Sequence, residues 1–218
     1  MASFDVILQT RASLYASDDP SEFISEYTGV ITCVDDETDA ETKVGRLSAL
    51  RVHAGLACNA GESLFDVCDS HSRELQYLHS LLYEPDGHFF KDVVATRFHA
   101  DHADLLLIDY VILNPRWRKL NLGLLAVRKA IDLLGGGVGL AVSNISPLLP
   151  ECHKSMRVPA SWLPGHATAG ARRAACVRLR HHFRRMGFVR VGRTPYYVLS
   201  LTQILPTAAQ LLGPDAGT

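Results

Sequence analysis

The sequence predicts a single α/β domain built on a mixed β-sheet, and three observations support this prediction. The chain has 218 residues, which suits one globular domain, and 47% of them are apolar, as in an ordinary folded protein. Segments with the hydrophobic period of strands alternate along the chain with segments that have the period of helices. In the second half a strand, a helix and a strand follow one another, and such a unit makes its two strands parallel neighbours.

The first half of the chain contains mainly predicted strands. Four segments have the apolar runs or the loose alternation of strands or hairpin arms: 4–8, 29–34, 43–56 and 89–98. One helix is expected between them, because Ser63 is a good N-terminal cap and apolar residues at helical spacing continue from it to about Tyr83.

The second half contains the strand–helix–strand unit. Residues 103–113 are almost continuously apolar, as expected of a strand that is covered on both faces. A helix is predicted at 121–134, where three glycines end it, and a short apolar strand follows at 138–142. The remaining elements are an irregular segment at 143–170, an arginine-rich helix at 171–186, and strands at 189–191 and 196–201.

The composition argues against several classes of protein. No apolar run reaches the roughly 18 residues that a transmembrane helix needs. The first residues lack the basic and apolar regions of a secretion signal. The five cysteines include no C-x-x-C pair, which argues against a disulfide framework or a zinc site. We therefore expect a cytoplasmic protein with reduced thiols, no membrane segment and no metal.

The charges are unevenly distributed along the chain. Residues 1–104 contain 19 acidic and 7 basic side chains, whereas residues 105–218 contain 4 acidic and 15 basic ones. Two solvated faces of one domain would explain this. Alternatively, the basic half receives a phosphorylated ligand and the acidic half attracts a cation. Nucleic acid is not an expected partner, because the arginines are not interleaved with aromatic residues.

One segment predicts an anion site. From Ile108 it reads IDYVILNPRWRKLNLGLLAVRKAID, which is a strand, a turn at Asn114 and Pro115, a basic loop and an amphipathic helix. A short loop that enters a helix leaves backbone N–H groups free at the helix start. Together with the helix dipole these donors suit a phosphate group. A solvated basic loop is the structural alternative.

The same segment resembles motif A of the GNAT superfamily, the acyl-CoA-dependent N-acyltransferases. Arg118, Asn121 and Gly123 stand on the three defined positions of that family's pyrophosphate loop, Arg/Gln-x-x-Gly-x-Gly/Ala. Asn121 replaces the usual first glycine, and asparagine is the non-glycine residue that best tolerates positive φ. The stretch FRRMGF at 183–188, followed by VRVGRTPYYVLSL, is similar to the helix–Gly–Phe–strand–strand ending of the family.

The resemblance covers residues 104–202 and implies the GNAT fold. In this fold helices flank a central, mostly antiparallel sheet that contains one splayed pair of parallel strands. We therefore expect a single GNAT-like domain at 1–205 and a tail at 206–218 that frays.

The resemblance also implies a co-substrate, acetyl-CoA or another acyl-CoA. Its pantetheine is expected in the gap between the splayed strands, and its pyrophosphate on the N–H groups of the basic loop, where cationic side chains add hydrogen bonds. The residues expected to bind acyl-CoA are Ile112, Leu113, Arg116, Arg118, Lys119, Leu120, Asn121, Leu122, Gly123 and Leu124.

Family members transfer the acyl group by direct attack of a primary amine on the thioester. Asp109 matches a position where they often carry an acid, and it is the only charge in an otherwise apolar strand. It is the expected proton acceptor or amine anchor, and a structural ion pair is the alternative. Phe183 replaces the family's helix tyrosine, and Cys176 replaces its helix asparagine. The donor to the departing thiolate is then expected from Tyr196, Tyr197 or His182.

The acceptor is expected to be a small molecule or a protein with a cationic amine, because the first half of the chain is acidic. The alternative function is a GNAT-fold module that binds acyl-CoA as a sensor or scaffold without turnover. The departures at Asn121, Cys176 and Phe183 keep that alternative open. The sequence leaves open whether the chain forms a homodimer.

Overall fold

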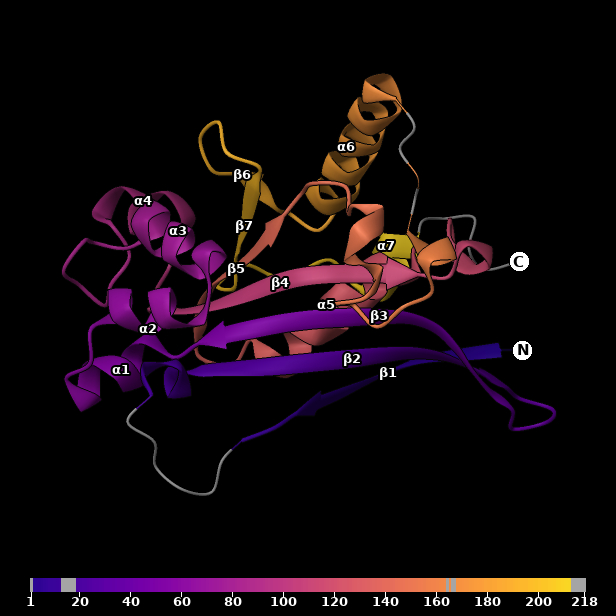
Figure 1. Cartoon of the computed structure of the whole chain (residues 1–218), viewed down its shortest axis with the longest axis horizontal. Coiled ribbons are helices and arrows are strands. Elements are labelled where there is room, and N and C mark those ends of the chain that lie inside the picture. Colours follow the sequence, from indigo (N-terminus) through magenta and orange to yellow (C-terminus); the bar gives the residue numbers. More distant parts are fainter. Residues whose placement is uncertain (1, 13–18, 164, 166–167, 213–218) are drawn as a thin grey trace.

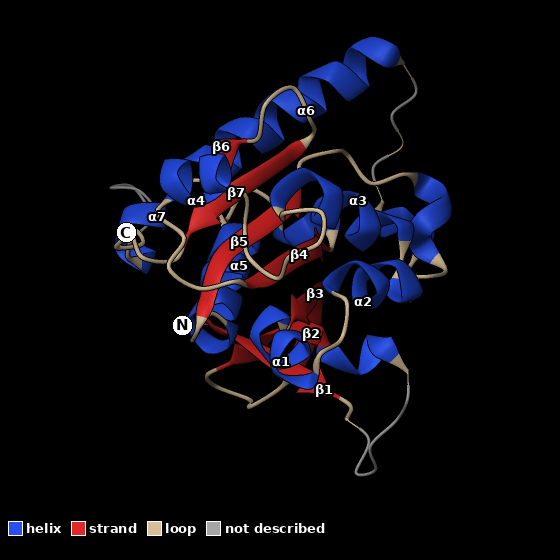
Figure 2. Cartoon of the chain, turned by 90° about the vertical axis from the view of Figure 1, so that its left-hand side faces the viewer, coloured by secondary structure: helices blue, strands red, loops and turns tan. Residues whose placement is uncertain are grey.

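The structure is a computed structural model that describes residues 2–12, 19–163, 165 and 168–212. The described residues form one seven-stranded sheet with helices on both faces (Figures 1 and 2). The strand order is β1–β2–β3–β4–β5–β7–β6. Every neighbouring pair is antiparallel except β4 and β5, which are parallel. This mixed sheet with flanking helices is the predicted α+β fold class.

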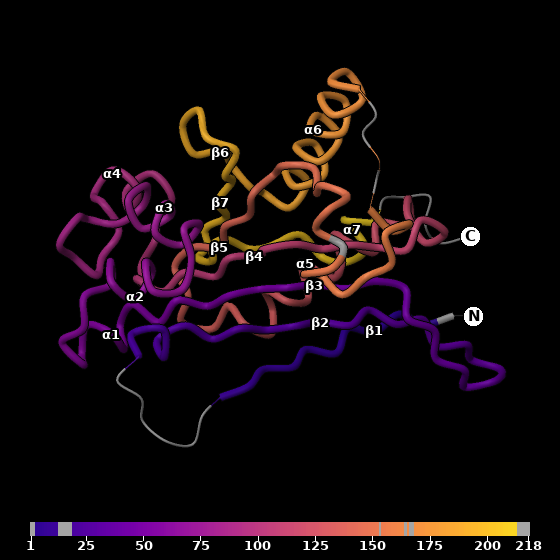
Figure 3. The backbone as a smooth tube through the Cα atoms, viewed as in Figure 1, coloured from indigo at the N-terminus to yellow at the C-terminus, as the bar shows by residue number. Residues whose placement is uncertain are grey.

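Figure 3 traces the path of the backbone through these elements. The strands are β1 (Ala2–Thr10), β2 (Ile24–Asp35), β3 (Glu41–Val52), β4 (Asp104–Leu113), β5 (Val138–Asn144), β6 (Val189–Arg190) and β7 (Tyr196–Ser200). The helices are α1 (Ala54–Ala60), α2 (Leu64–His71), α3 (Arg73–Leu82), α4 (Asp92–Phe98), α5 (Leu122–Leu134), α6 (Ala169–Arg184) and α7 (Ala208–Leu212). Among the described residues, no helix has the length and apolar character needed to cross a membrane.

Strand β4 lies in the middle of the sheet and joins its two cores. Leu105 and Leu107 pack with α1 to α4 on one face, whereas Leu106 and Ile108 pack with α5 on the other. All four side chains are buried. Successive side chains of a strand point to opposite faces, so a strand covered on both faces must be apolar throughout. The continuous apolar run in the sequence therefore predicted this strand correctly.

The predicted strand at 89–98 is wrong, because most of this segment forms α4. Val94 and Phe98, four residues apart, enter the core beneath α2 and α3, whereas Val93 is 70% exposed and Phe89 is 68% exposed. This is a helical burial pattern. The β-branched and aromatic residues of the segment favour a strand locally, and packing against the core overrides that preference.

Two other predicted elements have different ends. The helix expected from Ser63 to Tyr83 is divided at Ser72, which adopts an extended conformation and caps α3 by accepting a hydrogen bond from the Leu75 N–H at 3.2 Å. Ser63 caps α2 in the same way, as predicted. The strand expected at 43–56 ends at Val52, and α1 begins at Ala54.

The prediction that the chain frays after Pro206 is wrong for the described residues of the tail. Residues 208–212 form α7, and Leu211 is only 1% exposed within the core beneath α5. Thr207 and Gln210 form a reciprocal capping box, with N–H to side-chain oxygen distances of 2.8 and 3.3 Å. Residues 213–218 lie outside the described part of the chain.

The segment at 143–170 is irregular, as predicted, apart from the end of β5, two short 3-10 turns and the first residues of α6. Its apolar residues form a small core against the end of β4, made of Ile112, Met156, Val158, Trp162 and Leu163. The part of this segment at 164 and 166–167 lies outside the described residues. The described part of this segment therefore packs against the C-terminal end of β4.

Candidate functional site

The parallel pair at the centre of the sheet separates partway along β4. The last paired residues are Ile108 and Ser143, and the Ser143 hydroxyl donates a hydrogen bond to the Ile108 carbonyl at 3.0 Å. Beyond this point β4 continues to Leu113 and pairs only with β3. The edge of β4 at 109–113 therefore has no neighbouring strand on the β5 side among the described residues.

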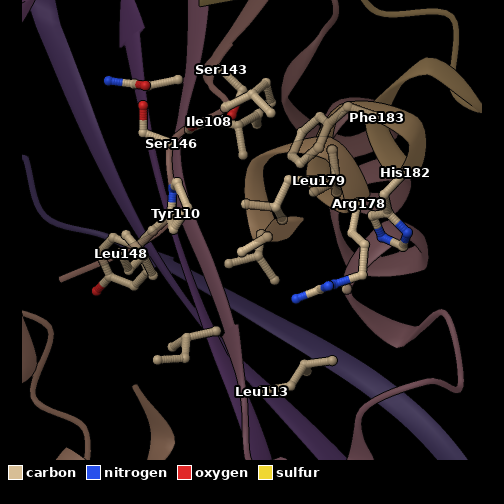
Figure 4. Close-up of a pocket in the computed structure, with 18 of the residues that line it drawn as sticks. Ile108, Tyr110, Leu113, Ser143, Ser146, Leu148, Arg178, Leu179, His182 and Phe183 are labelled. Carbon is tan, nitrogen blue, oxygen red and sulfur yellow. Dashed lines mark hydrogen bonds between the residues drawn. The ribbon is translucent and has the colours of Figure 1, made fainter. Parts of the chain in front are cut away.

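A cavity of about 500 Å³ occupies this gap. Its walls are β4 from Ile108 to Leu113, the loop and first turn of α5, the segment at 143–148, and α6. In Figure 4 the α6 side chains Arg178, Leu179, His182 and Phe183 lie across the cavity from β4. Pockets of this size commonly hold small ligands, so the gap is the candidate functional site.

The loop before α5 supplies hydrogen-bond donors at one end of the cavity. Lys119 and Asn121 have positive φ values of 74° and 56°. No described residue accepts a hydrogen bond from the backbone N–H groups of residues 119–123. These groups lie at the start of a 13-residue helix, where the helix dipole favours an anion.

Most of the residues predicted to bind acyl-CoA line the cavity, and Arg118 also holds the loop before α5 in place. Arg118 donates from Nε and Nη2 to the Leu113 carbonyl at 3.2 and 3.1 Å, and from Nη2 to the Trp162 carbonyl. Its guanidinium therefore braces the loop against β4. Ile112, Leu113, Lys119, Asn121, Leu122 and Gly123 line the cavity together with Arg118, whereas Arg116, Leu120 and Leu124 do not.

Two backbone donors of the predicted loop are already engaged. The N–H of Arg118 donates to the Pro115 carbonyl, and that of Leu124 donates to the Asn121 carbonyl. The candidate anion site is therefore limited to the N–H groups between these two residues.

Asp109 lies where β4 bulges. Ser48 of β3 is opposite Tyr110 and Ala49 is opposite Ile108, so Asp109 is the extra residue on β4. Burial raises the pKa of the Asp109 carboxyl, and the nearby charge of Glu74 raises it further. A hydrogen bond from Ser48 and the charge of His71 act in the opposite direction. Asp109 therefore holds its proton more tightly than an ordinary aspartic acid.

Glu74, on α3, is a polar residue that the sequence did not single out. The Tyr196 hydroxyl donates to Glu74 Oε1 at 2.9 Å, and Asn144 Nδ2 donates to the same oxygen at 3.4 Å. Burial and the charge of Glu74 raise the pKa of Tyr196. Tyr196 follows Glu74 by 122 residues, so no local pattern could have predicted this contact.

The three predicted proton donors lie in different places. Tyr196 packs on the α1–α4 side of the sheet, and Tyr197 is buried in the core on the other side. Neither tyrosine lines the cavity, whereas His182 does. Burial lowers the pKa of His182, and the charges of Arg185 and His181 lower it further. Phe183 also lines the cavity and packs edge-on against Phe188, with ring centroids 5.2 Å apart.

No family model, curated protein or solved structure matches this chain.

Replacing Asp109 by asparagine should stabilise the protein at neutral pH. The folded-state pKa of Asp109 lies above its ordinary value of 3.8, so ionisation costs more in the folded state than in the unfolded state. The wild type should therefore lose stability relative to Asp109→Asn as the pH rises through the window above 3.8. Urea unfolding at pH 7 and near pH 3 measures this difference, which should disappear at the lower pH.

Asp101→Asn is the matched control, because Asp101 is exposed and its replacement should change little at either pH. A wild type that is more stable than Asp109→Asn at pH 7 would show instead that the carboxylate takes part in a stabilising ion pair.

Proposed function

We propose that this protein is an N-acyltransferase of the GNAT type, which transfers an acetyl or other short acyl group from acyl-CoA to a primary amine. One observation carries the proposal. A single cavity joins the unpaired edge of β4 to the free N–H groups of residues 119–123. An extended chain with amide groups can bind along the first feature, and a diphosphate can bind at the second. Acyl-CoA contains both parts in that order.

In this proposal pantetheine lies against β4 near Ile112 and Leu113, and the diphosphate lies at the start of α5. Lys119 lines the cavity and has an exposed side chain, so it adds charge for the phosphates. Arg178, on α6, also lines the cavity with an exposed side chain and is a second cationic contact. Arg118 contributes by fixing the shape of the loop.

The proposed reaction is direct attack of the amine on the thioester carbonyl. The C–N bond forms, the C–S bond breaks, and the amine proton must leave. Asp109 lies at the bulge of β4, and its raised pKa makes it a stronger base than an ordinary carboxylate. It is the proposed proton acceptor, directly or through water, and CoA leaves as the thiol after it gains a proton.

The proposed acceptor is a cationic amine. Glu74 acts electrostatically on Asp109, and Glu26 pairs with the neighbouring His71, with Oε1 and Nε2 3.0 Å apart. Acids of the first half of the chain thus lie near the proposed base, and they favour a positively charged substrate there.

Gly123→Glu should abolish CoA binding without unfolding the protein. A Cβ at this position would lie 3.7 Å from the side chains of Leu113 and Val111, which is an ordinary contact. The remaining carboxylate would lie beside the N–H groups that the diphosphate needs and would repel its charge. Isothermal titration with CoA measures this loss.

The control is Gly136→Glu, which adds the same charge beyond the other end of α5, where no atom would lie within 4 Å of the new Cβ. Equal CoA affinity of Gly123→Glu and the wild type would place the ligand elsewhere.

Asp109→Asn should reduce turnover by a factor of about 10² or more while the affinity for CoA stays the same. The amide keeps the shape of the side chain and cannot accept the proton of the amine. The measurement is thiol release from acetyl-CoA with panels of cationic, neutral and anionic amines. Unchanged turnover would leave Asp109 a structural role, and acylation of only neutral or anionic amines would exclude the proposed acceptor class.

The alternative function is a module that binds acyl-CoA without turnover. The observation that favours it is Phe183, which lines the cavity at the position where the family has a tyrosine, because phenylalanine cannot donate a proton to the thiolate. Tyr196, a proposed substitute, already donates to Glu74, and Tyr197 is buried away from the cavity. His182 is therefore the proposed donor that the cavity wall supports best.

Phe183→Tyr should increase turnover, by up to about 10², because it restores a phenol donor in the cavity wall. Parallel pH–rate profiles of the wild type and of His182→Gln test whether the imidazole replaces that donor. If Phe183→Tyr is folded and no variant shows turnover with any amine, the module without turnover is the better description.

A further inference from the structure

The start of α5 is fixed from behind by three side-chain hydrogen bonds, which we call the clasp. Arg185 Nη1 donates to Asn121 Oδ1 at 3.1 Å, and Arg185 Nη2 donates to the Leu211 carbonyl. Asn121 Nδ2 donates to the Leu212 carbonyl at 3.4 Å. The clasp thus joins the loop before α5 to the end of α6 and to α7.

Helix α7 is anchored to the rest of the fold, so the carbonyl groups that accept the clasp bonds have fixed positions. Leu211 is buried in the core, and the Thr207–Gln210 capping box fixes the start of the helix. The Arg128 Nε, on α5, donates to the Pro206 carbonyl at 3.0 Å and secures the segment that leads into α7. The clasp therefore ties Asn121 to a part of the fold that is itself anchored.

Asn121 is the position where the clasp can act on the anion site. It has a left-handed conformation, with φ 56° and ψ 9°, and its N–H is one of the five free donors. A non-glycine residue adopts this conformation at an energetic cost. Both polar atoms of the Asn121 side chain are used in the clasp, so the same bonds that occupy the side chain also favour the backbone conformation.

We propose that the clasp is a positioning device for the anion site, with Arg185 as its central residue. Arg185 does not line the cavity, so it acts through Asn121. Arg185 holds Asn121 in the left-handed conformation. In this conformation the N–H groups of residues 119–123 are arranged to bind the diphosphate of CoA together. The affinity for the CoA diphosphate therefore depends on α7 and on a residue outside the binding surface. This inference rests on the proposed function.

The test compares Arg185→Met, Asn121→Gly and the double variant with the wild type. Asn121→Gly removes the two clasp bonds made by the Asn121 side chain without changing charge, and it keeps the access of residue 121 to positive φ. Arg184→Met is the matched control, because it removes an exposed positive charge from the neighbouring position of α6. The measurements are the Kd of CoA and of inorganic pyrophosphate by calorimetry, and the urea unfolding midpoint of each variant.

Each single variant should bind CoA about tenfold more weakly, as expected if the competent loop conformation falls to about a tenth of the population. The double variant should lose less than the sum of the two single effects, because both changes break the bond between Arg185 and Asn121. Arg184→Met should change the Kd by less than about twofold. Where turnover is measurable, the KM for acyl-CoA should rise while kcat at saturation stays constant.

Folded Arg185→Met and Asn121→Gly variants that bind CoA as tightly as the wild type would overturn the inference and leave the proposed function intact. Lower unfolding midpoints with unchanged Kd values would give the clasp a purely structural role. Additive losses in the double variant would mean that the two residues act separately. A wild type that binds neither CoA nor pyrophosphate would exclude both the inference and the proposed function. If Arg185→Met does not fold, Asn121→Gly alone decides.

Discussion

The end of pairing between β4 and β5 after Ile108 and Ser143 is the constraint on which the site depends. Up to this pair the two strands share backbone hydrogen bonds, and beyond it β4 pairs only with β3 within the part of the chain that the structure describes. Backbone groups that lose a partner must find another or remain open to solvent or ligand. The cavity, the wall formed by α6 and the small core at the end of β4 all surround this opening.

The opening separates two kinds of electrostatic environment. At one end of the cavity, free N–H groups and the dipole of α5 favour negative charge. Toward the other, burial raises the pKa of the half-buried Asp109 carboxyl, and the charge of Glu74 raises it further. A buried carboxyl group with a raised pKa lowers the stability of the folded protein at neutral pH when it ionises. Groups with such perturbed pKa values are common at functional sites. The proposed acyl-CoA and the proposed cationic amine would each meet the end that favours its charge.

Among the described residues, four of the twelve arginines in the basic half of the chain donate hydrogen bonds to backbone carbonyl groups of the protein itself. Arg118, Arg185 and Arg190 donate to backbone carbonyl groups, and so does Arg128. These bonds hold loops and helix α7 against the rest of the fold. Some basic residues of this half therefore stabilise the fold. Others, such as Lys119 and Arg178, line the cavity with exposed side chains.

The sequence by itself determined the parts that depend on local patterns. The cap at Ser63 and the glycines after α5 predicted the ends of those helices, because each acts within a few residues. The apolar run predicted β4, because a strand covered on both faces must be apolar throughout. Positive φ at Asn121 was also predictable, since its chemistry permits that conformation. The Thr207–Gln210 capping box was a readable signal for α7 that the prediction of a fraying tail overlooked.

Only the tertiary structure decided the remaining features. It made residues 92–98 a helix, because burial of Val94 and Phe98 outweighs the local preference of the segment for a strand. It placed Glu74 beside Tyr196, and it brought the guanidinium of Arg118 to the carbonyl of Trp162. Such contacts join residues far apart in the chain, and their formation depends on how whole elements pack. The spacing of residues along the sequence therefore could not predict these contacts.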